Sequence, residues 1–109
     1  PMLYALFRPS VQPYLISWFA VNPQEEIQKL KIPVLIIQGT QDIQVGTKEA
    51  ELLHNAKPDA SKILINGMNH ILKPAGLKRS KNIATYNDPN IAIDSQLIIE
   101  ISHFINSLQ

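Results

Sequence analysis

The fold of this chain is decided by one stretch, Val34-Leu35-Ile36-Ile37-Gln38-Gly39-Thr40-Gln41-Asp42. It opens with four consecutive apolar residues, mostly β-branched, which are typical of a strand buried on both faces, as in parallel sheets. The strand ends at a glycine, and the carboxylate of Asp42 follows three residues later. A second apolar run, residues 63–65, likewise ends near a glycine that precedes His70 by three residues. Because open α/β sheets place their chemistry at the C-terminal ends of strands, Asp42 and His70 are candidates for one shared site.

A helix is expected between the two strands. Thr47 is placed to cap a helix of about ten residues that runs to Lys57 and is ended by Pro58. The second strand is expected over Lys62–Ile65. Strand, helix and strand within about thirty residues predict a right-handed βαβ unit with parallel strands.

The first 31 residues are expected to form short helices. One begins near Ser10 as its cap, and another begins at Asn22, where Glu25 is placed for a capping box. The first of these carries an apolar stripe of Val11, Tyr14, Leu15, Trp18 and Phe19. The stripe favours packing on a sheet or core, and a lid that lines a substrate pocket is the alternative interpretation.

The C-terminal part of the chain divides into a loop and a helix. Residues 68–93 lack periodicity and predict a long loop, in which the cations Lys73, Lys78, Arg79 and Lys81 are either solvated or hold an anion. Asp94 is the expected cap of a final amphipathic helix that docks on the sheet, with Glu100 on its outer side. The apolar stripe of this helix comprises Leu97, Ile98, Ile101, Phe104, Ile105 and Leu108.

Composition excludes several classes of function. The 109 residues suffice for one domain at most, and a net charge of +1 gives no general attraction to nucleic acid or anionic lipid. With no cysteine, the chain has neither a disulfide framework nor a thiol nucleophile. Its longest apolar stretch, residues 14–21, is far shorter than the ~20 residues of a membrane span. No cofactor is expected, and a metal site built from Asp42, His54 and His70 is disfavoured by the ligand spacing.

Asp42 and His70 together have the chemistry of an acid–base pair. Neighbouring parallel strands lie ~4.8 Å apart, so residues that follow adjacent strand ends can touch. A carboxylate on imidazole Nδ1 fixes the tautomer and stabilises the imidazolium, as in a Ser-His-Asp triad. Two alternatives remain open for these residues: Asp42 could cap the helix that starts at Gly46–Thr47, and His70 could bind backbone. Asp88, in an Asn-Asp-Pro turn, is the second candidate for the acid.

These motifs resemble the C-terminal part of the α/β-hydrolase fold. The resemblance is carried by I-P-V-L-I-I-Q-G-T-Q-D at 32–42, by I-L-I-N-G-M-N-H at 63–70 and by the terminal amphipathic helix. It implies that Asp42 is the triad acid and His70 the triad base. It also implies a single partial domain over 1–109, with lid-like helices in 1–31 and the last two strands and last two helices of the sheet in 32–109.

Two functions follow as expectations. The resemblance implies a serine hydrolase that cleaves small-molecule esters or amides; its G-x-S-x-G nucleophile motif is not among these residues, so the 109-residue chain alone is expected to be inactive. The alternative is a non-enzymatic α/β module for self-assembly or binding. A buried-type strand left at a sheet edge is an association site, so a homo-oligomer is expected, formed by strand pairing or by swapped N-terminal helices.

Overall fold

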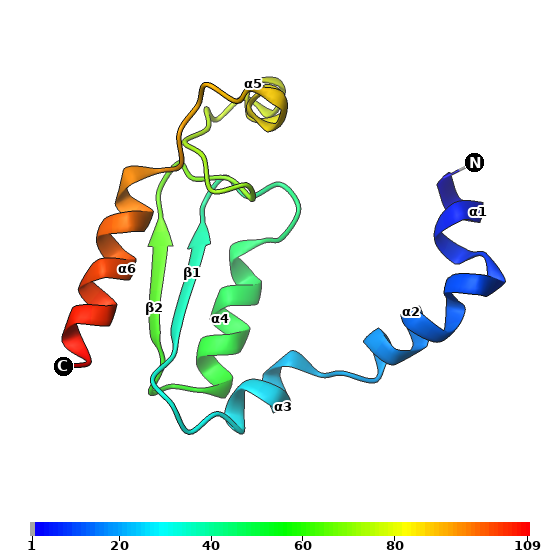
Figure 1. The fold of residues 1–109 in the computed structure, drawn as a ribbon, viewed down its shortest axis with the longest axis horizontal. Helices are drawn as coiled ribbons and strands as arrows, with labels where there is room; N and C mark the ends of the chain where they lie inside the picture. Colours follow the sequence, from blue (N-terminus) through cyan, green and yellow to red (C-terminus); the bar gives the residue numbers. More distant parts are fainter. Residues whose placement is uncertain (1) are drawn as a thin grey trace.

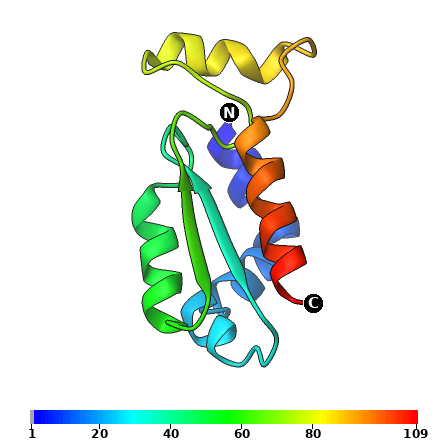
Figure 2. The ribbon, with the colours of Figure 1, turned by 90° about the vertical axis from the view of Figure 1, so that its left-hand side faces the viewer.

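The structure is a computed structural model that describes residues 2–109, and within these residues it is a mixed α/β fold with six α-helices and a two-stranded parallel sheet. The strands and the helix between them form the centre, with α4 against one face of the sheet and α6 against the other (Figures 1 and 2). The helices are α1 (Met2–Phe7), α2 (Gln12–Phe19), α3 (Pro23–Gln28), α4 (Thr47–Ala56), α5 (Arg79–Ala84) and α6 (Ser95–Ser107). The strands are β1 (Leu35–Gly39) and β2 (Ser61–Ile65), and two 3₁₀ turns are η1 (Pro9–Val11) and η2 (Thr85–Asn87).

The predicted βαβ unit is confirmed. Strand β1 pairs in parallel with β2, with Ile37 opposite Ile63 and Gly39 opposite Ile65. Side chains alternate between the two faces of a strand, so Ile36 packs with Ala50 of α4, whereas Ile37 and Ile63 pack against the cluster of Ile65 on the other face. The β-branched run at 34–37 therefore serves two thin cores, one on each side of the sheet.

The outer edge of β1 has no partner strand within residues 2–109. Backbone groups of Val34 and Thr40 form hydrogen bonds to the β2 side, so by alternation those of Leu35 and Ile37 lie on the open side. A strand of this apolar character is usually central in a sheet, because its two faces are both covered. In the described fold, the open edge of β1 is therefore a place where backbone hydrogen-bonding groups lack a partner strand.

Helix α6 begins as predicted but docks differently. The Asp94 side chain accepts a hydrogen bond from Gln96 N at 2.9 Å, which confirms the cap. Only Leu97 of the apolar stripe is buried, whereas Ile105 is 53% exposed. Glu100, predicted to lie outside, is half-buried and lines a cleft beside β2. Two strands offer too narrow a face to cover the whole stripe, so much of it stays in solvent.

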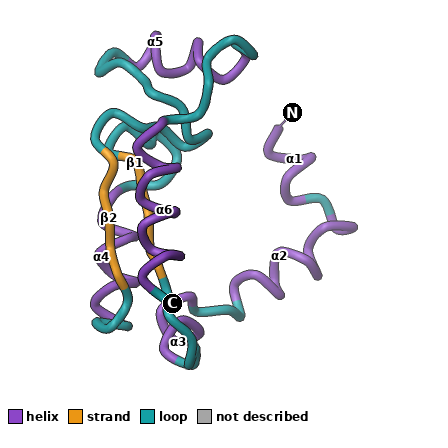
Figure 3. The backbone as a smooth tube through the Cα atoms, turned by 60° about the vertical axis from the view of Figure 1, so that its left-hand side comes forward, coloured by secondary structure: helices purple, strands orange, loops and turns teal. Residues whose placement is uncertain are grey.

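The N-terminal helices do not pack on the sheet. Helices α1 and α2 project away from it (Figures 1 and 3). Tyr14 and Trp18 contact each other, with ring centroids 5.0 Å apart, yet both are largely exposed, and Phe19 is 81% exposed. The expectation that the α2 stripe packs on a sheet or core is therefore wrong for these residues.

Three expected caps have different outcomes. Asn22 caps α3, since its Oδ1 accepts hydrogen bonds from Gln24 N and Glu25 N. Ser10 caps no helix; its Oγ accepts a hydrogen bond from Arg8 Nε instead. At α4, Gly46 occupies the cap position and no side chain caps the helix, so Thr47 is its first residue rather than its cap.

Residues 68–93 are not a structureless loop, because they contain α5 and η2. There is a physical reason why sequence periodicity did not reveal these elements. Their buried residues are polar, Asn82 and Thr85, while the apolar Ile83 is half exposed. A helix held in place by polar contacts has no apolar stripe to detect. Within residues 2–109 no helix combines the length and apolar character needed to cross a membrane.

Candidate active site

The loops that follow β1 and β2 touch each other at a glycine. A Cβ built on Gly39 would lie 2.0 Å from the carbonyl oxygen of Met68, so only glycine permits this approach. The contact is held by hydrogen bonds from Thr40 N to Ile65 O at 3.0 Å and from Gln41 N to Met68 O at 2.9 Å. The close approach brings the residues that follow, on both loops, to one end of the sheet.

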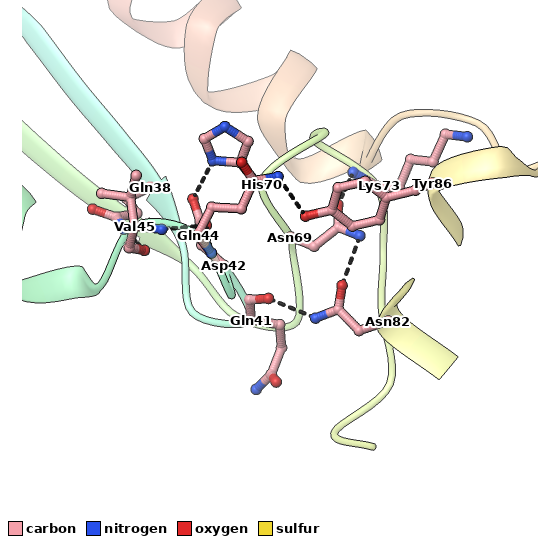
Figure 4. Close-up of polar contacts among 10 residues, drawn as sticks. All are labelled: Gln38, Gln41, Asp42, Gln44, Val45, Asn69, His70, Lys73, Asn82 and Tyr86. Carbon is pink, nitrogen blue, oxygen red and sulfur yellow. Dashed lines mark hydrogen bonds and ion pairs between the residues drawn. The ribbon is translucent and has the colours of Figure 1, made fainter. Parts of the chain in front are cut away.

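Asp42 and His70 meet at this end, as predicted. Asp42 Oδ2 lies 2.9 Å from His70 Nδ1 (Figure 4). An ionised carboxylate can only accept, so the proton of this hydrogen bond lies on Nδ1 and Nε2 is left as the basic nitrogen. Nε2 is on the side of the ring away from Asp42, and the His70 side chain is 40% exposed.

The second oxygen of Asp42 is held by backbone. Oδ1 accepts hydrogen bonds from Gln44 N at 2.9 Å and Val45 N at 2.8 Å. Burial alone would raise the pKa of Asp42, but the hydrogen bonds from Val45, His70 and Gln44 outweigh it and hold the pKa below the ordinary value. Asp42 thus orders the turn before α4 and contacts His70 at the same time, while the side chain itself remains 8% exposed.

The other candidate acid is placed elsewhere. Asp88 Oδ1 accepts a hydrogen bond from Asn90 N at 2.9 Å, which is the turn expected of an Asn-Asp-Pro sequence. In the part of the chain that the structure describes, Asp42 is the one carboxylate within ion-pair distance of His70. The structure therefore pairs His70 with Asp42 and not with Asp88.

A buried polar network lies beneath His70, and sequence reasoning missed it. Asn69 Nδ2 donates to Asn82 Oδ1 at 3.1 Å and to Thr85 Oγ1 at 2.7 Å. Asn69 Oδ1 accepts from Lys73 N at 3.0 Å, which closes the turn that carries His70. No sequence signal points to these residues, because lone asparagines in an aperiodic segment are usually loop residues.

Lys73 is part of this network, and its ammonium group is engaged by backbone carbonyl oxygens. Its Nζ donates to Thr85 O at 3.0 Å and to Asp88 O at 2.6 Å. The ammonium group ties the loop of His70 to the segment of α5 and η2. Of the four cations considered as an anion site, this one serves the fold.

A cleft of about 240 Å³ opens beside the pair. Its walls include Asp42, His70, Val45 and Ile37, the last from the open-edged strand β1. On the rim, Leu72 has a φ of 65°, a left-handed conformation that is strained for a branched side chain. Such strain tends to cluster at functional sites. The cleft therefore adjoins both the acid–base pair and strand β1.

Among the described residues, no three His, Cys, Asp or Glu side chains gather as a metal site, and His54 lies on α4, apart from the cleft lining.

No protein-family model and no curated protein matches this sequence. The geometry itself thus carries the functional argument. A carboxylate, an oriented imidazole and an adjoining cleft can take a proton from a group placed near Nε2 and return it.

Proposed function

We propose that this chain is the C-terminal part of a serine hydrolase of the α/β-hydrolase fold, which cleaves small-molecule esters or amides. The observation that carries the proposal is the 2.9 Å contact between Asp42 Oδ2 and His70 Nδ1 just beyond the ends of two adjacent parallel strands. In such an enzyme, His70 Nε2 takes the proton of a serine nucleophile and later delivers it to the leaving group. Asp42 orients the imidazole and stabilises the imidazolium.

The nucleophile must come from residues outside this chain. Residues 1–109 contain no G-x-S-x-G motif, so the proposed elbow and oxyanion hole belong to preceding strands. The position of the cleft supports this arrangement. The cleft is lined by residues of β1 such as Ile37, so a further strand paired with the open edge of β1 would end close to the cleft.

The projecting helices α1 and α2 support the choice of a substrate with an apolar acyl or alkyl group. Trp18 and Phe19 are exposed aromatic side chains on α2, with Phe7 exposed on α1. Exposed apolar residues gathered on one segment commonly mark a binding surface. In the proposed enzyme this segment is the lid over the acyl group.

The test is to extend the reading frame upstream and assay the longer protein with p-nitrophenyl esters and a fluorophosphonate probe. We expect a G-x-S-x-G motif, serine labelling, and a loss of roughly 10⁶-fold in kcat for His70→Gln. His103→Gln is the matched control, since His103 is an exposed histidine of α6, and it should retain activity. The 109-residue chain alone should not hydrolyse the ester above the buffer rate. An upstream frame with no nucleophile elbow refutes the proposal.

A second candidate function, self-assembly or binding without catalysis, is favoured by a different observation. Within residues 2–109 the outer edge of β1 has no partner strand, and apolar side chains of α6 such as Ile105 are exposed on the same small fold. Unpaired edges and apolar patches are association sites. Under this proposal the chain forms a homo-oligomer, by strand pairing or by exchange of α1 and α2. A stable monomer at micromolar concentration in sedimentation velocity contradicts it.

A further inference from the structure

We propose that Asn82 is a positioning residue that keeps the loops of Asp42 and His70 at hydrogen-bonding distance. Asn82 lies on α5, and its side chain forms hydrogen bonds with the neighbours of Asp42 and His70 in the chain. The inference rests on the proposed function, because such positioning matters to catalysis only if the pair acts as acid and base. Its physical content, control of the hydrogen bond between the pair, can be measured without any catalytic activity.

The geometry of Asn82 is that of a bridge. Its Nδ2 donates to Gln41 O at 2.6 Å, and its Oδ1 accepts from Asn69 Nδ2 at 3.1 Å (Figure 4). Gln41 immediately precedes Asp42, and Asn69 immediately precedes His70. One amide group therefore joins the two residues next to the pair, one on each loop.

The bridge is isolated from water. Asn69 and Asn82 are each 1% exposed, so solvent cannot replace a hydrogen bond that is lost. Thr85 Oγ1 accepts from Asn69 Nδ2 and donates to the backbone carbonyl of Asn82, both at 2.7 Å, which ties the Asn69 amide to the backbone of α5. An unsatisfied buried amide is costly, so the network strongly favours one arrangement of the loops.

Only an amide side chain satisfies both ends of this bridge. The Gln41 carbonyl needs a donor and the Asn69 amide needs an acceptor, and asparagine supplies both on one planar group. Aspartate would keep the acceptor and lose the donor. Packing alone does not explain Asn82, because the apolar neighbour on the same helix, Ile83, is half exposed while Asn82 is buried.

A second, weaker contact joins the same segment to the loop of Asp42. Gln44 Nε2 donates to Tyr86 OH at 3.1 Å, and Gln44 N is one of the two backbone donors to Asp42. The segment of α5 and η2 thus contacts the Asp42 loop at two points. Of these two contacts, only the one made by Asn82 also includes a hydrogen bond to Asn69 in the His70 loop. Asn82 is therefore the residue to test.

The experiment follows the Nδ1 proton of His70 by NMR in the ¹⁵N-labelled 109-residue chain, recording the tautomer and the exchange of this proton with water. In Asn82→Ala we expect about tenfold faster exchange and loss of the single Nδ1–H tautomer, because the hydrogen bond to Asp42 opens more often. Asn87→Ala is the matched control. Asn87 is an exposed asparagine of η2, and its replacement should leave the proton unchanged.

Asn82→Asp serves where the alanine variant does not fold. It retains the size and the acceptor for Asn69, so the faster exchange should then report the lost donor to Gln41 together with the repulsion between a buried carboxylate and the Gln41 carbonyl oxygen. Native amide spectra with an unchanged His70 proton in either variant overturn the inference. Loss of the fold in both variants also overturns it, since Asn82 would then act in folding rather than in positioning.

Failure of this inference differs from failure of the proposed function. Asp42→Ala should abolish the protected Nδ1 proton whether or not Asn82 matters. If it does so while the Asn82 variants behave as wild type, the pair stands and the positioning role falls. The hydrolase proposal falls separately, in the ester assay of the extended protein.

Discussion

Replacing Gly39 with alanine should separate Asp42 from His70 without touching either side chain. A Cβ at this position would lie 2.0 Å from Met68 O and 2.9 Å from Met68 Cβ. The nearest obstacle is backbone, which cannot rotate away as a side chain can. The loop that carries Met68 and His70 must therefore move as a unit.

The size of the effect follows from the distances. Real Cβ contacts do not fall below 3.0 Å, so Met68 O must retreat by about 1 Å. The same movement would stretch the 2.9 Å contact between Asp42 and His70 beyond hydrogen-bonding distance. Overpacking costs about 1–3 kcal/mol, and loss of the bond from Gln41 N to Met68 O adds about 1 kcal/mol. We expect unfolding free energy to fall by roughly 2–4 kcal/mol.

Urea unfolding followed by circular dichroism measures this loss. With a slope of about 2 kcal/mol per molar, the midpoint should fall by about 1–2 M. Gly46→Ala is the matched control: a Cβ there meets nothing within 4 Å and φ is −75°, so its midpoint should change little. An unfolding free energy for Gly39→Ala within about 0.5 kcal/mol of wild type, with the His70 Nδ1 proton still protected, would refute the reasoning.

Three further predictions follow from the structure. The pKa of Asp42 is lower in the folded chain than its ordinary value of 3.8. Its ionised form therefore stabilises the fold fully above pH 3.8, and this stabilisation is lost as the pH falls through the lower folded pKa. The urea midpoint should thus change less between about pH 5 and pH 3 in Asp42→Asn than in the wild type. Asp94→Ala should lower the unfolding free energy by about 1 kcal/mol, measured by urea unfolding, because Gln96 N loses its cap. Trp18 is the one tryptophan and is exposed, so acrylamide should quench its fluorescence readily in the monomer. Self-association through α2 and α6 should protect Trp18 from quenching as the protein concentration rises, and Ile105→Lys on α6 should abolish this protection. Quenching that does not change with concentration would count against that assembly.

The sequence was most informative where local chemistry is sufficient. The β-branched run of β1, the Asn22 and Asp94 caps and the βαβ order depend on neighbouring residues, and all are found in the structure. The Asp42–His70 pair was also predictable, because parallel strands must end at the same edge of a sheet. Local chemistry failed at Ser10 and Thr47, where candidate caps make no capping bond.

The sequence by itself thus determined the strands, the main helices and the two residues of the pair. The tertiary structure alone decided what surrounds them. The bridge of Asn82 spans 41 positions to Gln41, a separation that no periodicity records, and its polar burial leaves no apolar stripe. The exposure of α6 and the projection of α2 were likewise decided in three dimensions. An apolar stripe shows that a helix has a face to bury, but only the extent of the sheet beneath determines how much of it is covered.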